Sequence, residues 1–175
     1  GKTFCSINLA LAYSITNKKT LLIGADLRKP KIFNDFNLKN TVGLSNYLIG
    51  AATFEEAIQS SSYDNLSIVS SGPIPPNPSE LIETEKMAEF ITRAKKEFDV
   101  VIIDTPPIGL VTDGMILSEF SDVNLYIVRQ RYTRKNQLEL IDNLFETQKI
   151  KHVGIIVNDL KEQKIGYNYG YSYGY

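Results

Sequence analysis

The sequence has little of what disulfide-bonded, zinc-binding and membrane-spanning proteins require. With one cysteine, Cys5, and one histidine, it can form no internal disulfide and lacks the ligands of an ordinary Cys/His zinc site. The lone cysteine also suits a reducing compartment. No apolar run approaches the ~20 residues of a membrane-spanning helix. Lys and Arg (19) nearly balance Asp and Glu (20), and a net charge of −1 gives no reason to expect nucleic acid as the main partner.

What the sequence does contain is typical of one globular domain. It has 175 residues, of which 43% are hydrophobic and 22% charged, enough to bury about two thirds of the unfolded chain's surface. Five short apolar runs predict strands, with helical stretches between them: 20–23, 66–69, 100–103, 125–128 and 153–157. These runs are continuous rather than alternating, which favours strands covered on both faces. We therefore expect an α/β fold with a doubly wound, mainly parallel sheet flanked by helices.

Helices are predicted from the spacing of apolar residues and from capping residues. Four are expected, over residues 2–15, 53–60, 79–98 and 134–148. Thr53 and Glu56 have the spacing of a capping box at the start of the second helix. Ser79 and Thr133 are the expected caps of the third and fourth.

Three segments carry phosphate chemistry. Gly1, Lys2 and Thr3 stand at the head of a predicted helix and match the end of the phosphate loop GxxxxGK[ST], in which the lysine reaches phosphate oxygens and the threonine binds Mg²⁺. Asp26 follows the first predicted strand, at the end where open α/β sheets bind ligands. Asp104 ends the run "VVII" as in a Walker B strand, whose carboxylate helps to hold Mg²⁺. Each also has an ordinary explanation, an exposed lysine or a turn carboxylate, but their order favours a P-loop nucleotide-binding domain.

The chain ends in "YNYGYSYGY", which holds five of its ten tyrosines. The intervening Asn, Gly and Ser give no packing incentive, so we expect this segment to be extended and flexible. Composition alone leaves three explanations open: an edge strand, a sticky low-complexity tail, or a row of phosphate acceptors. With the phosphate-binding motifs present, the third is favoured. The candidate acceptors are Tyr167, Tyr169, Tyr171, Tyr173 and Tyr175.

Together these segments resemble the cytoplasmic kinase domain of the bacterial tyrosine kinases that govern capsule and exopolysaccharide export. These are P-loop proteins related to cell-division and plasmid-partition ATPases. "LLIGADLR" resembles the family's motif of a hydrophobic triplet followed by DxDxR, and "GLSNYLIG" resembles the helix after it. "GPIPPNPSELI" is close to the family's GPxPPNPxELL stretch, and "VIIDTPPIGLVTDGMIL" resembles its Walker B strand and switch region. The tyrosine cluster resembles the family's autophosphorylation tail.

The resemblance implies a protein-tyrosine kinase that uses ATP and Mg²⁺ and modifies the C-terminal tyrosines of a neighbouring subunit in a ring. The fifth-strand Asn of the family falls on Asn158, which would contact adenine. The implied site residues form three overlapping sets: Lys2, Asp26 and Asp104 as catalytic residues; Gly1, Lys2, Thr3 and Asn158 as nucleotide-binding residues; and Thr3, Asp26 and Asp104 as residues that organise Mg²⁺.

The resemblance also implies an organisation and a setting. Residues 1–165 would form the P-loop kinase domain and residues 166–175 the Tyr-rich tail. The implied partners are further copies of the chain, a membrane-embedded activator or a fused upstream transmembrane region, and a cognate tyrosine phosphatase, with no nucleic acid. The domain, itself soluble, would work at the cytoplasmic face of the bacterial inner membrane and regulate exopolysaccharide synthesis and export.

Two departures from the family pattern bear on activity. The family's DxD reads Gly24-Ala25-Asp26 here, so one of its two carboxylates is missing and Asp26 must act as base, metal organiser or both. Phosphoryl transfer depends mostly on positioning and charge neutralisation, so we expect slow turnover. The loop and strand that precede GKT in the family are absent before Gly1, so we expect the natural protein to start upstream. Beside Asp26, Arg28 could face phosphate, an acidic neighbour or solvent.

Two other functions stay open. A partition-type (ParA- or MinD-like) ATPase switch would share the fold and the Walker motifs, but it has no use for five terminal tyrosines. A non-catalytic adaptor that is only a phosphorylation target would be consistent with the missing carboxylate at Gly24.

Overall fold

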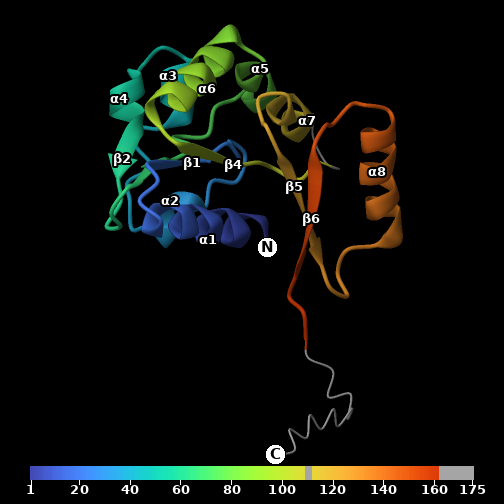
Figure 1. The fold of residues 1–175 in the computed structure, drawn as a ribbon. Helices are drawn as coiled ribbons and strands as arrows, with labels where there is room; N and C mark the ends of the chain where they lie inside the picture. Colours follow the sequence, from blue (N-terminus) through green and yellow to red (C-terminus); the bar gives the residue numbers. More distant parts are fainter. Residues whose placement is uncertain (109–111, 162–175) are drawn as a thin grey trace, which may run out of the picture.

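Two sheets lie side by side in the computed structural model, which describes residues 1–108 and 112–161 (Figure 1). The four-stranded sheet has the order β2-β3-β1-β4, and the two-stranded sheet pairs β5 with β6. The strands are β1 (Thr20–Gly24), β2 (Ile58–Ser60), β3 (Leu66–Val69), β4 (Val100–Asp104), β5 (Asn124–Arg129) and β6 (Val153–Asn158). All five predicted strands are therefore present, and the short edge strand β2 is additional.

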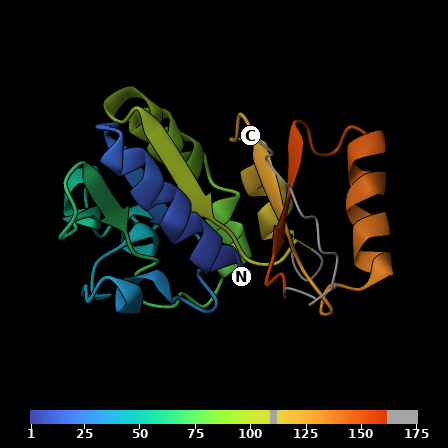
Figure 2. The ribbon, with the colours of Figure 1, turned by 60° about the horizontal axis from the view of Figure 1, so that its bottom comes forward.

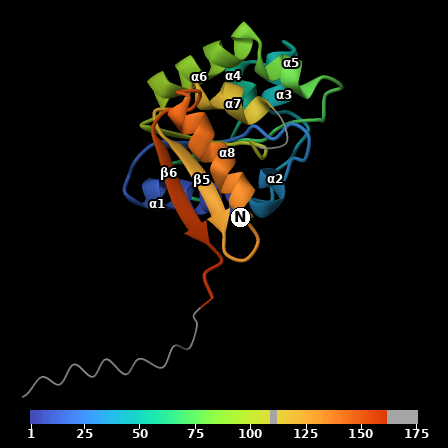
Figure 3. The same cartoon turned by 90° about the vertical axis from the view of Figure 1, so that its right-hand side faces the viewer.

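Helices cover the sheets in the manner of a doubly wound fold. They are α1 (Lys2–Ile15), α2 (Ile32–Asp35), α3 (Leu44–Leu48), α4 (Phe54–Ala57), α5 (Pro78–Ile82), α6 (Glu85–Glu97), α7 (Asp113–Ser118) and α8 (Lys135–Glu146). α1 and α2 lie on one face of the larger sheet, and α3, α5 and α6 lie on the other (Figure 1). α8 packs on the smaller sheet (Figure 3).

The central strand β1 explains why the apolar runs are continuous. All five of its residues are buried. Leu21 and Ile23 point into the core shared with α3, α5 and α6, whereas Leu22 points into the core shared with α1 and α2. Side chains alternate across a strand, so a strand covered on both faces needs an apolar residue at each position. On the smaller sheet, Ile141 and Leu144 of α8 form the corresponding core.

The predicted fold class is confirmed. β1 pairs in parallel with β3 and with β4, and β5 pairs in parallel with β6. Of the strands in the described residues, only β2 runs antiparallel, at the edge against β3. In the register between β1 and β4, Gly24 lies opposite Asp104, so the chain leaves both strands at the same edge of the sheet.

The helix predicted over 53–60 is only half present. Its capping box is real: Glu56 N–H donates to Thr53 Oγ1 at 3.3 Å, and Thr53 N–H donates to a Glu56 carboxylate oxygen at 2.7 Å. The helix then ends after one turn, because Ile58 is extended and begins β2, where ladder hydrogen bonds to β3 replace helical ones. Tertiary pairing overrides the local preference here.

The single helix predicted over 79–98 is two helices, α5 and α6. Thr84 interrupts it with an extended backbone and is the N-cap of α6. The predicted cap Ser79 was wrong: Pro78 takes the first helical position of α5, for which its fixed φ is suited, and Asn77 is the N-cap. The predicted cap Thr133 was also wrong, because Arg134 precedes α8 and the Thr133 hydroxyl accepts the backbone N–H of Arg129 at 2.8 Å instead.

The predicted tail, 166–175, lies outside the described residues, and so do its five tyrosines. Within the described part of the chain, none of the helices is both long and apolar enough to cross a lipid bilayer.

Candidate active site

The first turn of α1 meets the end of β4 at a buried carboxylate. Asp104 is 5% exposed. Thr3 Oγ1 donates to Asp104 Oδ2 at 2.8 Å, and Ser6 Oγ donates to Asp104 Oδ1 at 3.1 Å. Thr3 and Ser6 are three residues apart and therefore share a helix face. Thr3 was predicted from the sequence, whereas Ser6 was not, although its spacing from Thr3 places both on one helix face.

The pKa of Asp104 is raised from its ordinary value, and burial is the main cause. The hydrogen bonds from Thr3 and Ser6 and the charge of Lys2 act in the opposite direction, while the charge of Asp26 raises the pKa further. Lys2 and Asp26 are thus near enough for their charges to act on Asp104. The ionised form of this carboxylate is short of positive charge, which a bound cation would supply.

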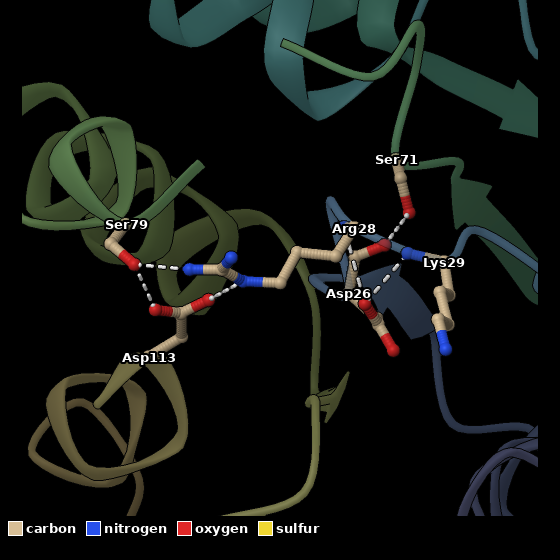
Figure 4. A network of polar contacts seen from close by, with 6 residues as sticks. All are labelled: Asp26, Arg28, Lys29, Ser71, Ser79 and Asp113. Atoms are coloured by element: carbon tan, nitrogen blue, oxygen red, sulfur yellow. Dashed lines mark hydrogen bonds and ion pairs between the residues drawn. The ribbon is translucent and has the colours of Figure 1, made fainter. Parts of the chain in front are cut away.

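Asp26 is held beside Asp104 by its own turn. It lies two residues beyond Gly24, which pairs with Asp104, and Ala25 N–H donates to the Asp104 carbonyl at 2.9 Å. The N–H groups of Arg28 and Lys29 donate to Asp26 Oδ1 at 3.2 and 2.9 Å. The other carboxylate oxygen points away from this turn (Figure 4). Asp26 therefore has one oxygen fixed by the backbone and one directed outward.

Ser71, two residues beyond the end of β3, forms hydrogen bonds to the same turn. Its hydroxyl lies 2.8 Å from the carbonyl of Gly24 and 3.2 Å from that of Asp26. The orientation of the Asp26 loop is thus determined by hydrogen bonds from two neighbouring strand ends.

The start of α1 lies against the end of β6. A Cβ atom added at Gly1 would lie 2.7 Å from Asn158 Nδ2 and 3.6 Å from a methyl group of Ile127. A larger residue at position 1 would therefore require the Asn158 side chain to shift. Figure 2 views the chain start and the smaller sheet from below. The structure therefore brings Gly1 and Asn158 together, as their shared assignment to nucleotide binding requires.

Arg28 pairs with an acidic neighbour, although its side chain stays partly exposed to solvent. Its Nε donates to Asp113 Oδ2 at 3.2 Å, and its terminal nitrogen donates to Ser79 Oγ at 2.6 Å (Figure 4). Asp113 begins α7 and is 1% exposed. Neither contact was predicted: Asp113 had no expected role, and Ser79 was expected to cap a helix.

These residues fit a magnesium–phosphate site. Within residues 1–108 and 112–161, no group of three or more His, Cys, Asp and Glu side chains could hold a metal ion. Mg²⁺ does not need such a group, because it is usually bound by one or two carboxylates together with waters and substrate phosphates. Asp104, Asp26 and the Thr3 hydroxyl are such a set, and Lys2 lies beside them at a helix N-terminus, where anions bind.

One depression among the described residues does not coincide with this site. Its volume is about 980 Å³, and it is lined by residues of α7 and by residues that precede β5 and β6, among them Ser121 and His152. None of the predicted site residues lines it. The candidate site is therefore defined by its polar groups and not by a cavity.

Comparison with known proteins gives one family model and many relatives. The family model described as an AAA domain matches residues 1–154. The tyrosine-protein kinase YwqD of Bacillus subtilis is 41% identical over 171 residues, covering 98% of this chain and 72% of the relative. The tyrosine-protein kinase ptk of Acinetobacter johnsonii is 41% identical over 167 residues, covering 95% of this chain but 23% of the relative. The chain thus spans most of one relative's length and about a quarter of the other's.

Solved structures agree with the sequence relatives. The kinase domain of the Escherichia coli tyrosine kinase ETK is 32% identical, with a TM-score of 0.87, and the match covers 98% of this chain and 68% of that one. The septum site-determining protein MinD of Pyrococcus horikoshii, complexed with Mg-ADP, matches with a TM-score of 0.74 at 21% identity, over 90% of this chain and 64% of that one. The second likeness concerns the fold alone.

Proposed function

The chain belongs to the bacterial tyrosine-protein kinases, a family of P-loop ATPases with an AAA domain, and from this premise we propose that it transfers the γ-phosphoryl group of ATP to tyrosines of a neighbouring copy. The acceptors are Tyr167, Tyr169, Tyr171, Tyr173 and Tyr175. The observation that carries this proposal is the junction of α1 with β4, where Thr3 and Ser6 donate to buried Asp104 while Lys2 and Asp26 lie close by.

Each of these side chains has a role in the proposal. When bound, ATP would supply the phosphoryl group, and its Mg²⁺ ion would supply the positive charge that offsets the ionised Asp104. The Thr3 hydroxyl and the carboxylates of Asp104 and Asp26 would hold the metal, and Lys2 would contact the phosphate oxygens. Asn158, adjacent to Gly1, would contact the nucleotide at the side of β6.

Asp26 has a second task, as the base. A tyrosine hydroxyl has an ordinary pKa of about 10 and must lose its proton during transfer. The outward oxygen of Asp26 is the available acceptor, since Gly24 stands where the family has its other carboxylate. With one carboxylate serving two purposes, turnover is slower than in relatives that keep both. The proton transfer that a base provides typically contributes about 10²–10⁴-fold to a rate.

The tyrosine tail, residues 166–175, is in this proposal a second functional unit beside the kinase domain, residues 1–165. Each phosphotyrosine adds about −1.5 to −2 charges, so a fully modified tail would carry roughly −8 to −10. Such tails would repel one another and the phosphates of ATP. Unmodified copies would therefore assemble, and heavily phosphorylated copies would separate, as light scattering before and after treatment with ATP would show.

The proposed setting follows the family. The chain would work at the cytoplasmic face of the bacterial inner membrane in a ring of copies, with a membrane-embedded activator or a fused transmembrane region and a tyrosine phosphatase as partners. Its phosphorylation cycle would regulate the synthesis and export of capsule or exopolysaccharide. Relatives bearing names such as "putative tyrosine-protein kinase in cps region" support this setting.

One experiment separates this function from its rivals. The natural full-length protein is incubated with Mg²⁺ and ATP, digested and weighed by mass spectrometry. Mass steps of one phosphate on the peptide that holds Tyr167–Tyr175, lost on Lys2→Met, are the expected result. Consumption of ATP without a mass change would instead indicate an ATPase switch. If the protein neither gains phosphate nor consumes ATP, it would be an adaptor that other kinases modify.

A further inference from the structure

We propose that Arg28 is a positioning residue, which keeps the active-site loops in place through Ser79 and Asp113. This inference rests on the proposed kinase function, because it assigns Arg28 to the support of Asp26. The three side chains form a closed triangle of hydrogen bonds (Figure 4). Arg28 donates to Asp113 at 3.2 Å and to Ser79 at 2.6 Å, and the Ser79 hydroxyl donates to the second Asp113 oxygen at 2.5 Å.

The burial of Asp113 distinguishes this triangle from an ordinary surface ion pair. The Asp113 side chain is 1% exposed, whereas that of Arg28 is 40% exposed. An exposed ion pair contributes little, but a buried carboxylate left without partners is unfavourable. Both Asp113 oxygens are used, one by Arg28 and one by Ser79. The charge of Asp113 therefore holds the Arg28 side chain in one orientation.

The triangle joins segments that leave three neighbouring strands. In the order β3-β1-β4, Ser79 follows β3, Arg28 follows β1 and Asp113 follows β4. All three segments start at the carboxyl edge of the sheet, where α/β proteins bind their ligands. One guanidinium thus connects the loop that carries Asp26 with the segment that continues from Asp104.

The connection acts on Asp26 through the backbone. The N–H groups of Arg28 and Lys29 donate to Asp26 Oδ1, so the carboxylate follows the position of these two residues. On the strand side, the loop is fixed where Ala25 N–H donates to the Asp104 carbonyl and where the Ser71 hydroxyl donates to the carbonyls of Gly24 and Asp26. On the far side it is fixed by the Arg28 side chain. Without that second anchor the turn that orients Asp26 would loosen, while Asp104 would keep its bonds from α1.

The predicted consequence is specific. In Arg28→Gln the loop amides should exchange hydrogen faster than in the wild type. The kcat of phosphorylation should fall by about 10- to 100-fold, and the Mg²⁺ concentration that gives half of the maximal rate should rise several-fold. A displacement of ~1 Å in a catalytic group has rate effects of this size. Arg28→Lys restores the charge but not the two-pronged geometry, so it should recover part of each effect.

The test uses the natural full-length protein. Exchange at the amides of Arg28 and Lys29 is measured without nucleotide, and phosphorylation is measured across a Mg²⁺ titration. Arg93→Gln is the matched control: Arg93 is an arginine of similar exposure, 43% against 40%, that pairs with Glu55 and Glu97 on α4 and α6, away from the site. This control should change neither exchange at the loop amides nor the Mg²⁺ requirement.

The outcomes separate the inference from the function it rests on. Unchanged exchange in Arg28→Gln overturns the positioning role, even where activity falls, because Arg28 would then act on the substrate directly. Faster exchange with an unaltered kcat and Mg²⁺ requirement also overturns it, since the triangle would then only stabilise the fold. If Arg28→Gln does not fold, Ser79→Ala, which keeps the ion pair, carries the same test with smaller effects. A wild-type protein that phosphorylates nothing refutes the proposed function, and the exchange measurement still reports on the loop.

Discussion

The ionised Asp104 carboxylate should destabilise the nucleotide-free protein. Asp104→Asn, which removes this charge, should therefore raise the stability of the protein. The pKa of Asp104 is raised, mainly by burial, which means that folding disfavours the ionised form. Asn has nearly the same shape and its amide can still pair with the hydroxyls of Thr3 and Ser6. Single substitutions that act through a buried group typically change stability by on the order of 1 kcal/mol. A gain of that size corresponds to roughly 2–4 °C in Tm for a chain of this size.

The sign of the pH dependence makes this prediction specific. A carboxyl group whose pKa is higher in the folded state than in the unfolded state binds more protons when folded, so its contribution to stability declines as the pH rises. The penalty is absent below the ordinary value of 3.8 and is complete above the raised pKa. Unfolding by urea between about pH 4 and pH 7.5 should show the advantage of Asp104→Asn growing with pH.

Two comparisons complete the assay. Asp122→Asn is the control, because the Asp122 side chain is 91% exposed and should show no such growth. Mg-ATP should raise the Tm of the wild type but not that of Asp104→Asn, since the variant loses a metal ligand. If Asp104→Asn is less stable than the wild type at pH 7.5, or if the difference does not depend on pH, the attribution of the raised pKa to burial is refuted.

Three further predictions concern neighbouring contacts. Thr3→Val leaves one oxygen of Asp104 without its donor and should lower the free energy of unfolding by about 1–3 kcal/mol. In this variant Mg²⁺ should no longer promote ATP binding, measured by calorimetry. An unchanged dependence of ATP binding on Mg²⁺ would exclude Thr3 from the metal site. Gly1→Ala would require the Asn158 side chain to shift, so the ATP affinity measured by calorimetry should fall, and Asn158→Ala alone should lower it too; an affinity unchanged in both variants would contradict a nucleotide-binding role for Asn158. Thr53→Ala removes the capping box of α4 and should cost about 1 kcal/mol by urea unfolding with phosphorylation unaffected, whereas a large loss of activity would show that α4 has a role in the site.

Much of the fold could be predicted from the sequence because a strand buried on both faces of its sheet shows as a continuous apolar run. Residues 21–23 are all apolar because α1 packs on one side of the strand and α6 on the other. The helix over 2–15 was predicted with both ends correct. Errors arose where local signals competed with partners distant in sequence: Ile58 joins β3, and Thr84 divides one expected helix into two.

The candidate site was predictable only in part, for a related reason. Asp26 follows the end of β1 and Asp104 ends β4. Parallel neighbours end at the same edge of a sheet, so the proximity of the two carboxylates follows from the strand order. The partners of Arg28 could not be predicted in this way. Asp113 lies 85 residues away in the sequence, and the Ser79 hydroxyl had a local alternative as a helix cap. Only the packing of α5 and α7 brings them together.

Transfer between copies is the central claim, and a mixture of two variants of the natural full-length protein tests it most directly. One copy carries Lys2→Met and an intact tail, and the other has an intact phosphate site and phenylalanine in place of its five tail tyrosines. Neither variant alone should acquire phosphate on the tail. Mixed with Mg²⁺ and ATP, the Lys2→Met copy should gain phosphate on the peptide that holds Tyr167–Tyr175, detected by mass spectrometry. A Lys2→Met tail that stays unmodified in the mixture, while the wild-type protein modifies its own, would contradict the account.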